Sequence, residues 1–303
     1  MSHISLNGQW LLTSPQHSHI SIPCSLPGDV HSALIQADLL PQPYFGCNEE
    51  LIQWVGESEW RLTTDFTLTT EQLTATAIDL NLSFVDTMAI VSINGTQVLT
   101  CSNMFRLYQV NVLPYLQQGV NHISIALARN DSEAQRRAEK LPFPVPWAVG
   151  NNQIPHMNTL RKTQCHAGWD WGICLLSTGV YNSLTLTPVY DTRLHHVRTQ
   201  QAWLPNGDCE VTVNVDCEVL RDCAEQALEI NFDKQVHTIA IDNTNNGIKT
   251  VTTTIIVKDP QRWWPAGYGE QPLYPLTVTL NNHTITKKLG LRELTLDTQT
   301  DAI

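Results

Sequence analysis

Apolar and polar residues alternate along much of this sequence, most regularly from Trp60 onward. Trp60, Leu62 and Phe66 are separated by more polar residues, and residues 78–84 repeat the alternation. A period of two predicts strands that place one face on a hydrophobic core. Further strands are expected at 6–12, 88–93, 97–100, 105–112, 122–127 and 175–188, with Asn94-Gly95 as a hairpin turn. Short strands at regular spacing indicate a sandwich or jelly roll.

One segment near the N-terminus shows helical spacing instead. Apolar residues recur every three or four positions from Val30 to Ala37. Asp29 occupies the N-cap position, and Pro41 is a helix terminator. A helix is therefore predicted at 30–40, followed by a loop that extends to Trp54.

The strand pattern restarts after a boundary at residues 188–192. Val211, Val213 and Val215 begin a new alternation. Strands are predicted at 211–219, 228–232, 236–241, 249–257, 274–280 and 284–289, with turns at Asn206-Gly207 and Asn246-Gly247. Roughly 100 residues of short strands without a helix are typical of an immunoglobulin-like sandwich. The chain is therefore predicted to be all-β.

Residues 131–160 interrupt the strand pattern. This segment is polar and charged up to Lys140, then rich in proline, and then contains Asn151-Asn152-Gln153. A loop of this length is usually functional or disordered. It leads directly into the most unusual stretch of the chain, so a functional loop is the better interpretation.

That stretch is Arg161-Lys-Thr-Gln-Cys-His-Ala-Gly-Trp-Asp-Trp-Gly172, which combines a basic pair, two tryptophans and an acid. If it forms a strand, Trp169 and Trp171 share one face and Asp170 lies on the other. The tryptophans could then anchor the segment on a core while the acid faces a cleft. The alternative is that both tryptophans are core packing and Asp170 is a turn residue.

Composition and charge narrow the possible partners. Hydrophobic residues make up 42% of the chain and charged residues 16%, which allows a sizeable core. The 18 basic and 29 acidic residues give a net charge of −11, without a basic run. This balance argues against nucleic acid or an anionic membrane as the main partner. No signal peptide and no apolar run of roughly 18 residues is visible, so we expect a cytoplasmic protein.

The cysteines favour neither a disulfide framework nor a metal site. Eight cysteines occur without a CxxC pair, and we expect free thiols, with Cys217–Cys223 as an alternative disulfide. Motifs for phosphate, dinucleotide and common hydrolase sites are absent. Four candidate metal ligands match no standard spacing, so no cofactor is predicted: His156, Cys165, His166 and Cys174. Glu49 and Glu50 are expected to be solvated loop residues.

Carbohydrate recognition fits the 161–172 stretch better. Aromatic faces pack on the C–H surfaces of sugars, and a carboxylate can accept hydrogen bonds from two neighbouring hydroxyls. Trp169, Asp170 and Trp171 supply both kinds of group, with Asn151 and Arg161 nearby in sequence. The residue types alone suggest a sugar ligand without fixing which one.

Several motifs along the whole chain together resemble the N-terminal part of β-mannosidases of glycoside hydrolase family 2. The 161–172 stretch is similar to the most specific signature of that group outside its catalytic barrel. Ile173 departs from the proline that many members carry at this position, so a different loop exit is expected. The other matching motifs are Leu6-Asn-Gly-Gln-Trp10, Leu26-Pro-Gly-Asp-Val-His-Ser-Ala-Leu34, Pro43-Tyr-Phe-Gly-Cys-Asn-Glu49, Gln53-Trp54, Trp60, Ile93-Asn-Gly95, Asn103-Met-Phe105, Gly119-Val-Asn121, Trp263-Trp-Pro-Ala-Gly-Tyr-Gly269, Gln271-Pro-Leu-Tyr274 and Gly290-Leu-Arg292.

The resemblance implies three parts. These are a jelly-roll, galactose-binding-like domain at 1–190, an immunoglobulin-like β-sandwich at 191–290, and at 291–303 the start of a linker to a (β/α)₈ barrel. In the family that barrel carries both catalytic glutamates of a retaining glycosidase. No catalytic residue is therefore assigned within these 303 residues, and the chain alone is expected to be inactive.

The resemblance also implies roles for individual residues. Asp170 is expected to contact hydroxyls of a terminal β-mannose, and Asn151 is a further substrate-binding candidate. Trp169 and Trp171 are either pocket wall or core anchors. Arg161 is expected to pair with a nearby acid. The implied partners are a β-mannoside oligosaccharide and the protein's own downstream barrel.

Two kinds of alternative function stay open at this point. An endo-β-mannosidase or an exo-β-glucosaminidase shares the same sandwich domains, because specificity lies largely downstream. A free-standing carbohydrate-binding module is the alternative outside the enzymes, and such a module should bind sugar measurably on its own.

Overall fold

The computed structural model describes residues 3–147, 153–221, 226–241, 245–281, 283–296 and 298. Asn151 and Cys223 lie outside the described residues. The chain divides into two compact units, Ser2–Pro188 and Val189–Ile303, and each unit is considered by itself. No helix among the described residues is long and apolar enough to span a membrane.

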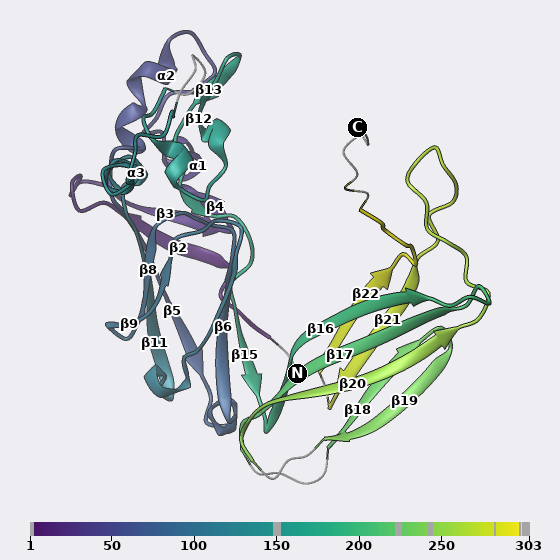
Figure 1. Cartoon of the computed structure of the whole chain (residues 1–303). Helices are drawn as coiled ribbons and strands as arrows, with labels where there is room; N and C mark the ends of the chain where they lie inside the picture. Colours follow the sequence, from purple (N-terminus) through teal and green to yellow (C-terminus); the bar gives the residue numbers. More distant parts are fainter. Residues whose placement is uncertain are drawn as a thin grey trace. The chain divides into compact units, whose positions relative to one another are not determined.

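The first unit is built on two antiparallel sheets (Figure 1). The six-stranded sheet has the order β3-β2-β5-β11-β8-β9, and the four-stranded sheet has the order β1-β15-β6-β10. The six strands are β2 (Gly8–Thr13), β3 (Ser21–Leu26), β5 (Trp60–Leu68), β8 (Ala89–Ile93), β9 (Thr96–Cys101) and β11 (Gly119–Leu127). The four are β1 (Ile4–Ser5), β6 (Ala77–Ser83), β10 (Leu107–Asn111) and β15 (Thr185–Val189).

The alternation in the sequence accounts for the core of this unit. Leu62 of β5 and Ile123 and Ile125 of β11 are buried, while polar residues between them are more exposed. Asn94 and Gly95 form the predicted two-residue turn between β8 and β9, and both have positive φ, as a type I′ hairpin turn requires. The all-β fold class and most of the predicted strands are confirmed for this unit. The strand predicted at 175–188 is wrong, because this range contains two separate short strands, β14 (Gly179–Val180) and β15, with irregular residues before and between them.

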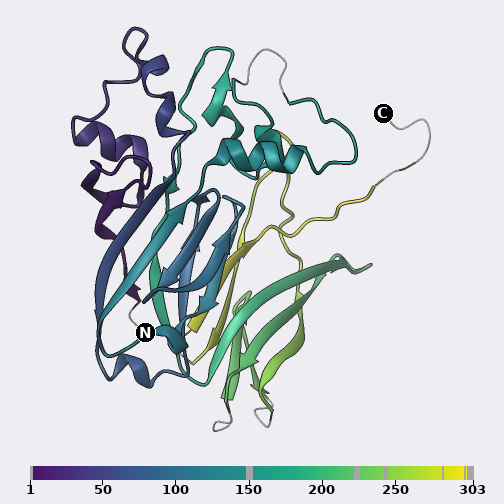
Figure 2. The same ribbon diagram turned by 90° about the vertical axis from the view of Figure 1, so that its left-hand side faces the viewer.

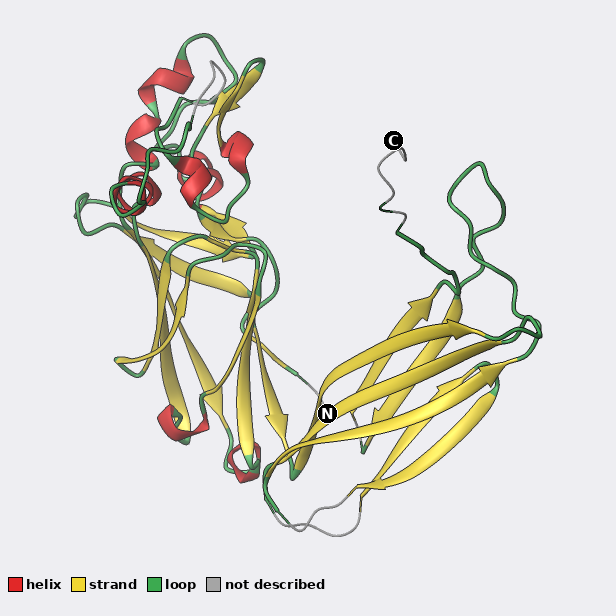
Figure 3. Cartoon of the chain, viewed as in Figure 1, coloured by secondary structure: helices red, strands yellow, loops and turns green. Residues whose placement is uncertain are grey.

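The three α-helices described in this unit, α1, α2 and α3, gather at one end of the sheets (Figures 1 and 3). Helix α1 (Val30–Gln36) begins as predicted, because the Asp29 carboxylate accepts a hydrogen bond from the Ser32 N–H at 2.9 Å. It ends earlier than the predicted residue 40. Asp38 adopts a left-handed conformation, and the N–H of Leu39 bonds to the carbonyl of Leu34, which closes a Schellman turn.

Other helical segments lie where the sequence predicted loops. Helix α3 (Asn130–Ala138) corrects the prediction of an unstructured segment from residue 131 onward. It has no apolar stripe, and Glu133 instead pairs with Arg136 and Arg137 at 2.6 and 2.7 Å. Helix α2 (Asn48–Leu51), helix η1 (Gln53–Val55) and helix η4 (Met157–Thr159) are short turns of the same region. Helices η2 (Gln72–Thr74) and η3 (Leu113–Tyr115) lie elsewhere.

The second unit is a sandwich of a three-stranded sheet, β16-β17-β20, and a four-stranded sheet, β19-β18-β21-β22. Its central strand β17 buries the predicted Val211, Val213, Val215 and Val219. The sequence missed β16, where Arg193, His195, His196 and Arg198 hide the alternation. The strands are β16 (Thr192–Trp203), β17 (Cys209–Val219), β18 (Gln226–Phe232), β19 (Gln235–Ile241), β20 (Gly247–Val257), β21 (Tyr274–Leu280) and β22 (His283–Leu289).

Candidate functional site

The 161–172 stretch ends in a small hairpin at the helical end of the first unit (Figure 2). Strands β12 (Ala167–Trp169) and β13 (Gly172–Cys174) pair with each other, and Asp170 and Trp171 form the two-residue turn between them. The stretch is therefore not the single strand that was considered from the sequence, and Trp169 and Trp171 do not share one strand face. Gly168 has a φ of 99°, a conformation that glycine adopts freely and that interrupts a regular strand.

Both tryptophans of the hairpin lie outside the core. Trp169 is 45% exposed and Trp171 is 85% exposed, so neither anchors the hairpin on a core. Gly172 lets the second strand pass close to Trp169, because a Cβ at Gly172 would lie 3.1 Å from the Cβ of Trp169. The exposed indole faces leave the role of pocket wall available, and their contact with a sugar stays a prediction.

Asp170 is exposed at the tip of this hairpin. Within the described part of the chain, no group donates a hydrogen bond to its carboxylate and no cation pairs with it. Aspartates that serve turn structure usually accept a nearby backbone N–H. The side chain of Asp170 makes no such bond with any residue that the structure describes, which leaves its carboxylate available to a ligand there.

The hairpin is held in place by side chains from the α2–η1 segment. The Glu49 Oε1 atom accepts a hydrogen bond from the Cys174 N–H at 2.7 Å. The Gln53 Nε2 atom donates to the Cys174 carbonyl at 2.9 Å. On the other strand, the Gln153 N–H donates to the Ala167 carbonyl at 2.7 Å. The expectation that Glu49 is merely solvated is therefore wrong.

A buried ion pair lies at the base of the same loop. The Lys162 Nζ atom is 3.1 Å from the Asp86 Oδ2 atom, and both side chains are 0% exposed. Burial by itself raises the pKa of Asp86, but the hydrogen bond from His166 and the charge of Lys162 outweigh it, so this pKa lies below its usual value. Burial lowers the pKa of Lys162, against the attraction of Asp86. This ion pair therefore links the 161–172 stretch to the segment of the chain that contains Asp86.

Asp86 belongs to a small three-stranded sheet, which places its carboxylate beside Lys162. It has the order β4-β14-β7 and consists of β4 (Gly28–Asp29), β7 (Val85–Asp86) and β14 (Gly179–Val180). A Cβ at Gly179 would lie 2.4 Å from the Gly28 carbonyl oxygen, so only glycine allows these strands to approach so closely. Segments far apart in the sequence thus meet beneath the hairpin.

His166 and Ser177 beside this pair do not form a nucleophilic relay. The His166 Nδ1 atom is 2.8 Å from the Ser177 Oγ atom and 3.3 Å from the Asp86 Oδ2 atom. A catalytic triad needs the serine and the acid on opposite nitrogens of the ring. Here both approach the same nitrogen, so the cluster is structural.

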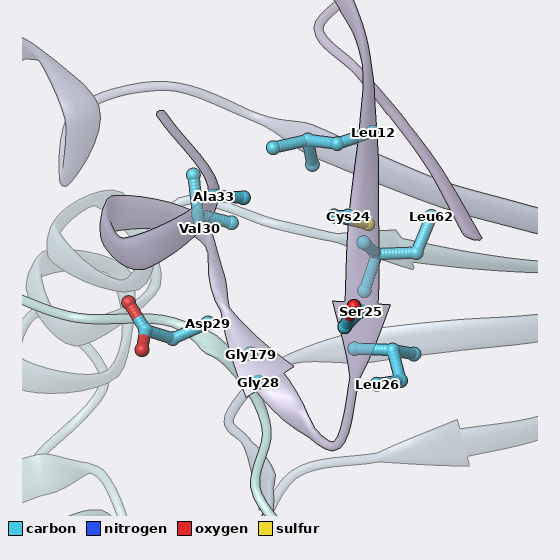
Figure 4. Close-up of a pocket in the computed structure, with 10 residues that line it drawn as sticks. All are labelled: Leu12, Cys24, Ser25, Leu26, Gly28, Asp29, Val30, Ala33, Leu62 and Gly179. Atoms are coloured by element: carbon cyan, nitrogen blue, oxygen red, sulfur yellow. The ribbon is translucent and has the colours of Figure 1, made fainter. Parts of the chain in front are cut away.

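The hollow in Figure 4 is also structural. It lies between α1 and neighbouring strands, is lined mainly by apolar side chains such as Leu12, Val30 and Leu62, and has no room for a water molecule. The Asp29 carboxylate points away from it and caps α1 instead. This hollow is therefore a narrow packing gap between α1 and the neighbouring strands, and it offers no ligand site.

Two further sequence predictions need correction or stay untested. Arg161 forms no ion pair with any described residue, and the neighbouring Lys162 makes the buried pair instead. Asn151 lies outside the described residues, so its role stays a prediction.

No three metal-ligating side chains converge within the described ranges. The seven described cysteines, Cys217 included, are free.

Comparison with known proteins decides the family. The model of the glycosyl hydrolase 2 galactose-binding domain-like family matches residues 10–182, more than half of the chain. The model of glycosyl hydrolases family 2 matches residues 192–292. The chain belongs to glycosyl hydrolase family 2. The resemblance drawn from its motifs is thereby confirmed, as is the all-β fold class.

The family 2 relatives that match this chain include several β-mannosidases. Beta-mannosidase B of Thermothelomyces thermophilus is 31% identical over 89% of this chain and 32% of its own length. A probable β-mannosidase of Caenorhabditis elegans is 26% identical over 97% of this chain and 34% of its own length. The chain thus spans about a third of the length of these relatives.

Solved structures agree with this assignment. The β-D-mannosidase of Dictyoglomus thermophilum matches all of this chain and 38% of its own with a TM-score of 0.87 and 26% identity. The exo-chitosanase of Amycolatopsis orientalis matches 97% of this chain and 34% of its own with a TM-score of 0.64 and 17% identity. At 17% identity, the similarity to the exo-chitosanase shows a shared fold and nothing more.

Proposed function

We propose that this chain is the non-catalytic front of an exo-acting β-mannosidase and that Asp170 binds hydroxyls of the terminal β-mannose. The observation that carries the proposal is the exposed carboxylate of Asp170, which has no partner among the described residues and lies at the tip of a hairpin held by hydrogen bonds and a buried ion pair. The names of the relatives support the substrate class. Their greater length supports a separate catalytic part.

The chemistry assigned to this chain is binding, without bond cleavage. A carboxylate accepts charge-assisted hydrogen bonds from sugar hydroxyls, and it is most effective when its position is fixed beforehand. The exposed faces of Trp169 and Trp171 can pack against the C–H surface of a sugar. On this proposal a downstream barrel supplies the acid/base and the nucleophile of a retaining glycosidase, and residues 1–303 alone hydrolyse no β-mannoside.

The test is a substrate panel for the complete protein. Aryl β-D-mannoside, β-D-glucosaminide and β-D-galactoside are compared by kcat/KM. We expect the mannoside to be preferred by about 100-fold or more. End-labelled mannan oligosaccharides should lose single residues from the non-reducing end. Preference for the glucosaminide, or internal cleavage of the oligosaccharides, would contradict the proposed substrate or the exo mode.

The binding-module alternative makes a different prediction. If residues 1–303 form a complete module, the isolated chain binds mannose oligosaccharides in calorimetry with measurable affinity. If they supply only one wall of a pocket, binding by the isolated chain is too weak to detect while the complete protein binds. We expect the second result.

A further inference from the structure

We propose that Glu49 and Gln53 are positioning residues that set the place of Asp170 through the backbone of Cys174. This inference rests on the proposed function of Asp170. Neither side chain is assigned a contact with the sugar. Their role is to hold the strand that carries the binding turn.

The side chains of Glu49 and Gln53 form hydrogen bonds with both backbone polar groups of Cys174, its N–H and its carbonyl. The Glu49 Oε1 atom accepts the Cys174 N–H at 2.7 Å, and the Gln53 Nε2 atom donates to the Cys174 carbonyl at 2.9 Å. Cys174 itself is fully buried and lies three residues after Trp171. Because both backbone groups are fixed, the strand can neither slide nor rotate without losing a hydrogen bond.

The hairpin needs this support because it is very small. Strands β12 and β13 have three residues each and form a two-stranded sheet of their own. A two-stranded hairpin is marginally stable by itself in water. Glu49 and Gln53 supply the acceptor and the donor that a third strand would otherwise provide, and the bond to the carboxylate is charge-assisted.

The two positioning residues are themselves tied to the core. Ile52 and Val55, one residue before and two residues after Gln53, are fully buried. The Gln53 Nε2 atom also donates to the Glu49 carbonyl at 2.8 Å, which links the two positioning residues directly. The chain of contacts therefore runs from the core through the α2–η1 segment to Cys174 and on to the turn.

The neighbouring Glu50 provides a matched control. It follows Glu49 in the same short helix, but its side chain is exposed and has no hydrogen-bond or ion-pair partner in the described part of the chain. Removing the Glu50 carboxylate changes the net charge by the same amount as removing that of Glu49. A difference between the two variants thus reports the contact with Cys174.

The first readout is the hairpin itself, independent of activity. Hydrogen exchange of peptides covering residues 164–176 is measured in the complete protein for Glu49→Ala, Glu49→Gln and Glu50→Ala. We expect exchange to rise by about 10-fold in Glu49→Ala, because the Cys174 N–H loses its acceptor. It should rise less in Glu49→Gln, whose amide oxygen can still accept, and stay unchanged in Glu50→Ala.

The second readout is a double-mutant cycle with Asp170 on an aryl β-mannoside. Glu49→Ala should lower kcat/KM by about 10-fold, since a small misplacement of a binding group is costly. In the Asp170→Ala background the same change should have little further effect, because Glu49 acts through Asp170. Glu49→Gln should retain most of the activity, which keeps the test valid if Glu49→Ala folds poorly.

Failure of this inference can be told apart from failure of the proposed function. If Asp170→Ala is defective but Glu49→Ala behaves like Glu50→Ala in both readouts, the positioning role alone is overturned. Additive effects of Glu49→Ala and Asp170→Ala likewise overturn it, because they indicate a general structural role. If Asp170→Ala has near-normal kinetics, the proposed function fails and the inference fails with it.

Discussion

At the scale of single residues, buried titratable groups are the most telling feature of the first unit. His31 is 3% exposed, and neither ring nitrogen has a hydrogen-bond partner among the described residues. Burial lowers its pKa to about 4, and the nearby charges of Lys162 and His166 add to this effect, while Asp29 opposes it. His31 is therefore neutral in the folded protein at neutral pH.

This environment predicts a loss of stability in mild acid. An unfolded histidine has a pKa of about 6.5, so the unfolded state binds more protons than the folded state as pH falls from about 6.5 towards 4. Between pH 7 and pH 5 the free energy of unfolding should fall by about 2 kcal/mol through His31 alone. Thermal unfolding of wild type and His31→Leu at both pH values checks this, with His19→Leu at an exposed position as control.

If the pH dependence is the same in His31→Leu and in wild type, the pKa of His31 does not differ between the folded and unfolded states, and the prediction is wrong.

The sequence places His31 on an apolar helix face but cannot show that its ring lacks a partner among the described residues. Likewise, Arg161 and Lys162 are adjacent in sequence, which does not show which of them is buried. In the structure the backbone of Arg161 forms a β-bridge with Asn103, and Lys162 is the residue whose side chain is buried against Asp86.

At the scale of secondary structure, alternation predicted most strands, since burial on one face leaves a period of two in the sequence. It failed where polar and charged residues make up most of a strand that is only partly buried, as in β16, and where ion pairs replace an apolar stripe, as in α3. The β12–β13 hairpin was also missed. Its strands are too short for a period, and its anchors Glu49 and Gln53 come from more than 100 residues earlier in the chain.

Gly168 gives a prediction for this hairpin. Its φ of 99° is strained for any residue with a side chain, so Gly168→Ala should destabilise the hairpin by about 1–3 kcal/mol. The matched control is Gly119→Ala, which introduces similar strain at a φ of 86° at the start of β11. We expect Gly168→Ala to lower kcat/KM of the complete protein and Gly119→Ala to leave it unchanged. Equal kinetics of the two variants would show that the shape of the hairpin does not matter.

At the scale of the whole molecule, two units of family 2 type are present, and the chain covers about a third of the relatives it matches. The motifs allowed the family to be predicted from sequence, because they are specific and lie along the entire chain. The sugar-binding role of Asp170 could be predicted only through that resemblance. The residue types around it suggest a sugar, but only the structure shows that Asp170 is exposed and has no partner within the described ranges.

The most direct test of the central claim is the effect of Asp170→Ala on turnover of an aryl β-mannoside by the complete protein. We expect kcat/KM to fall by about 100-fold or more, because a fixed charged acceptor for the sugar hydroxyls is lost, with the unfolding temperature unchanged. Asp233→Ala, in the turn between β18 and β19, should have wild-type kinetics. Near-normal kcat/KM in Asp170→Ala would contradict the account and make this aspartate an ordinary turn residue.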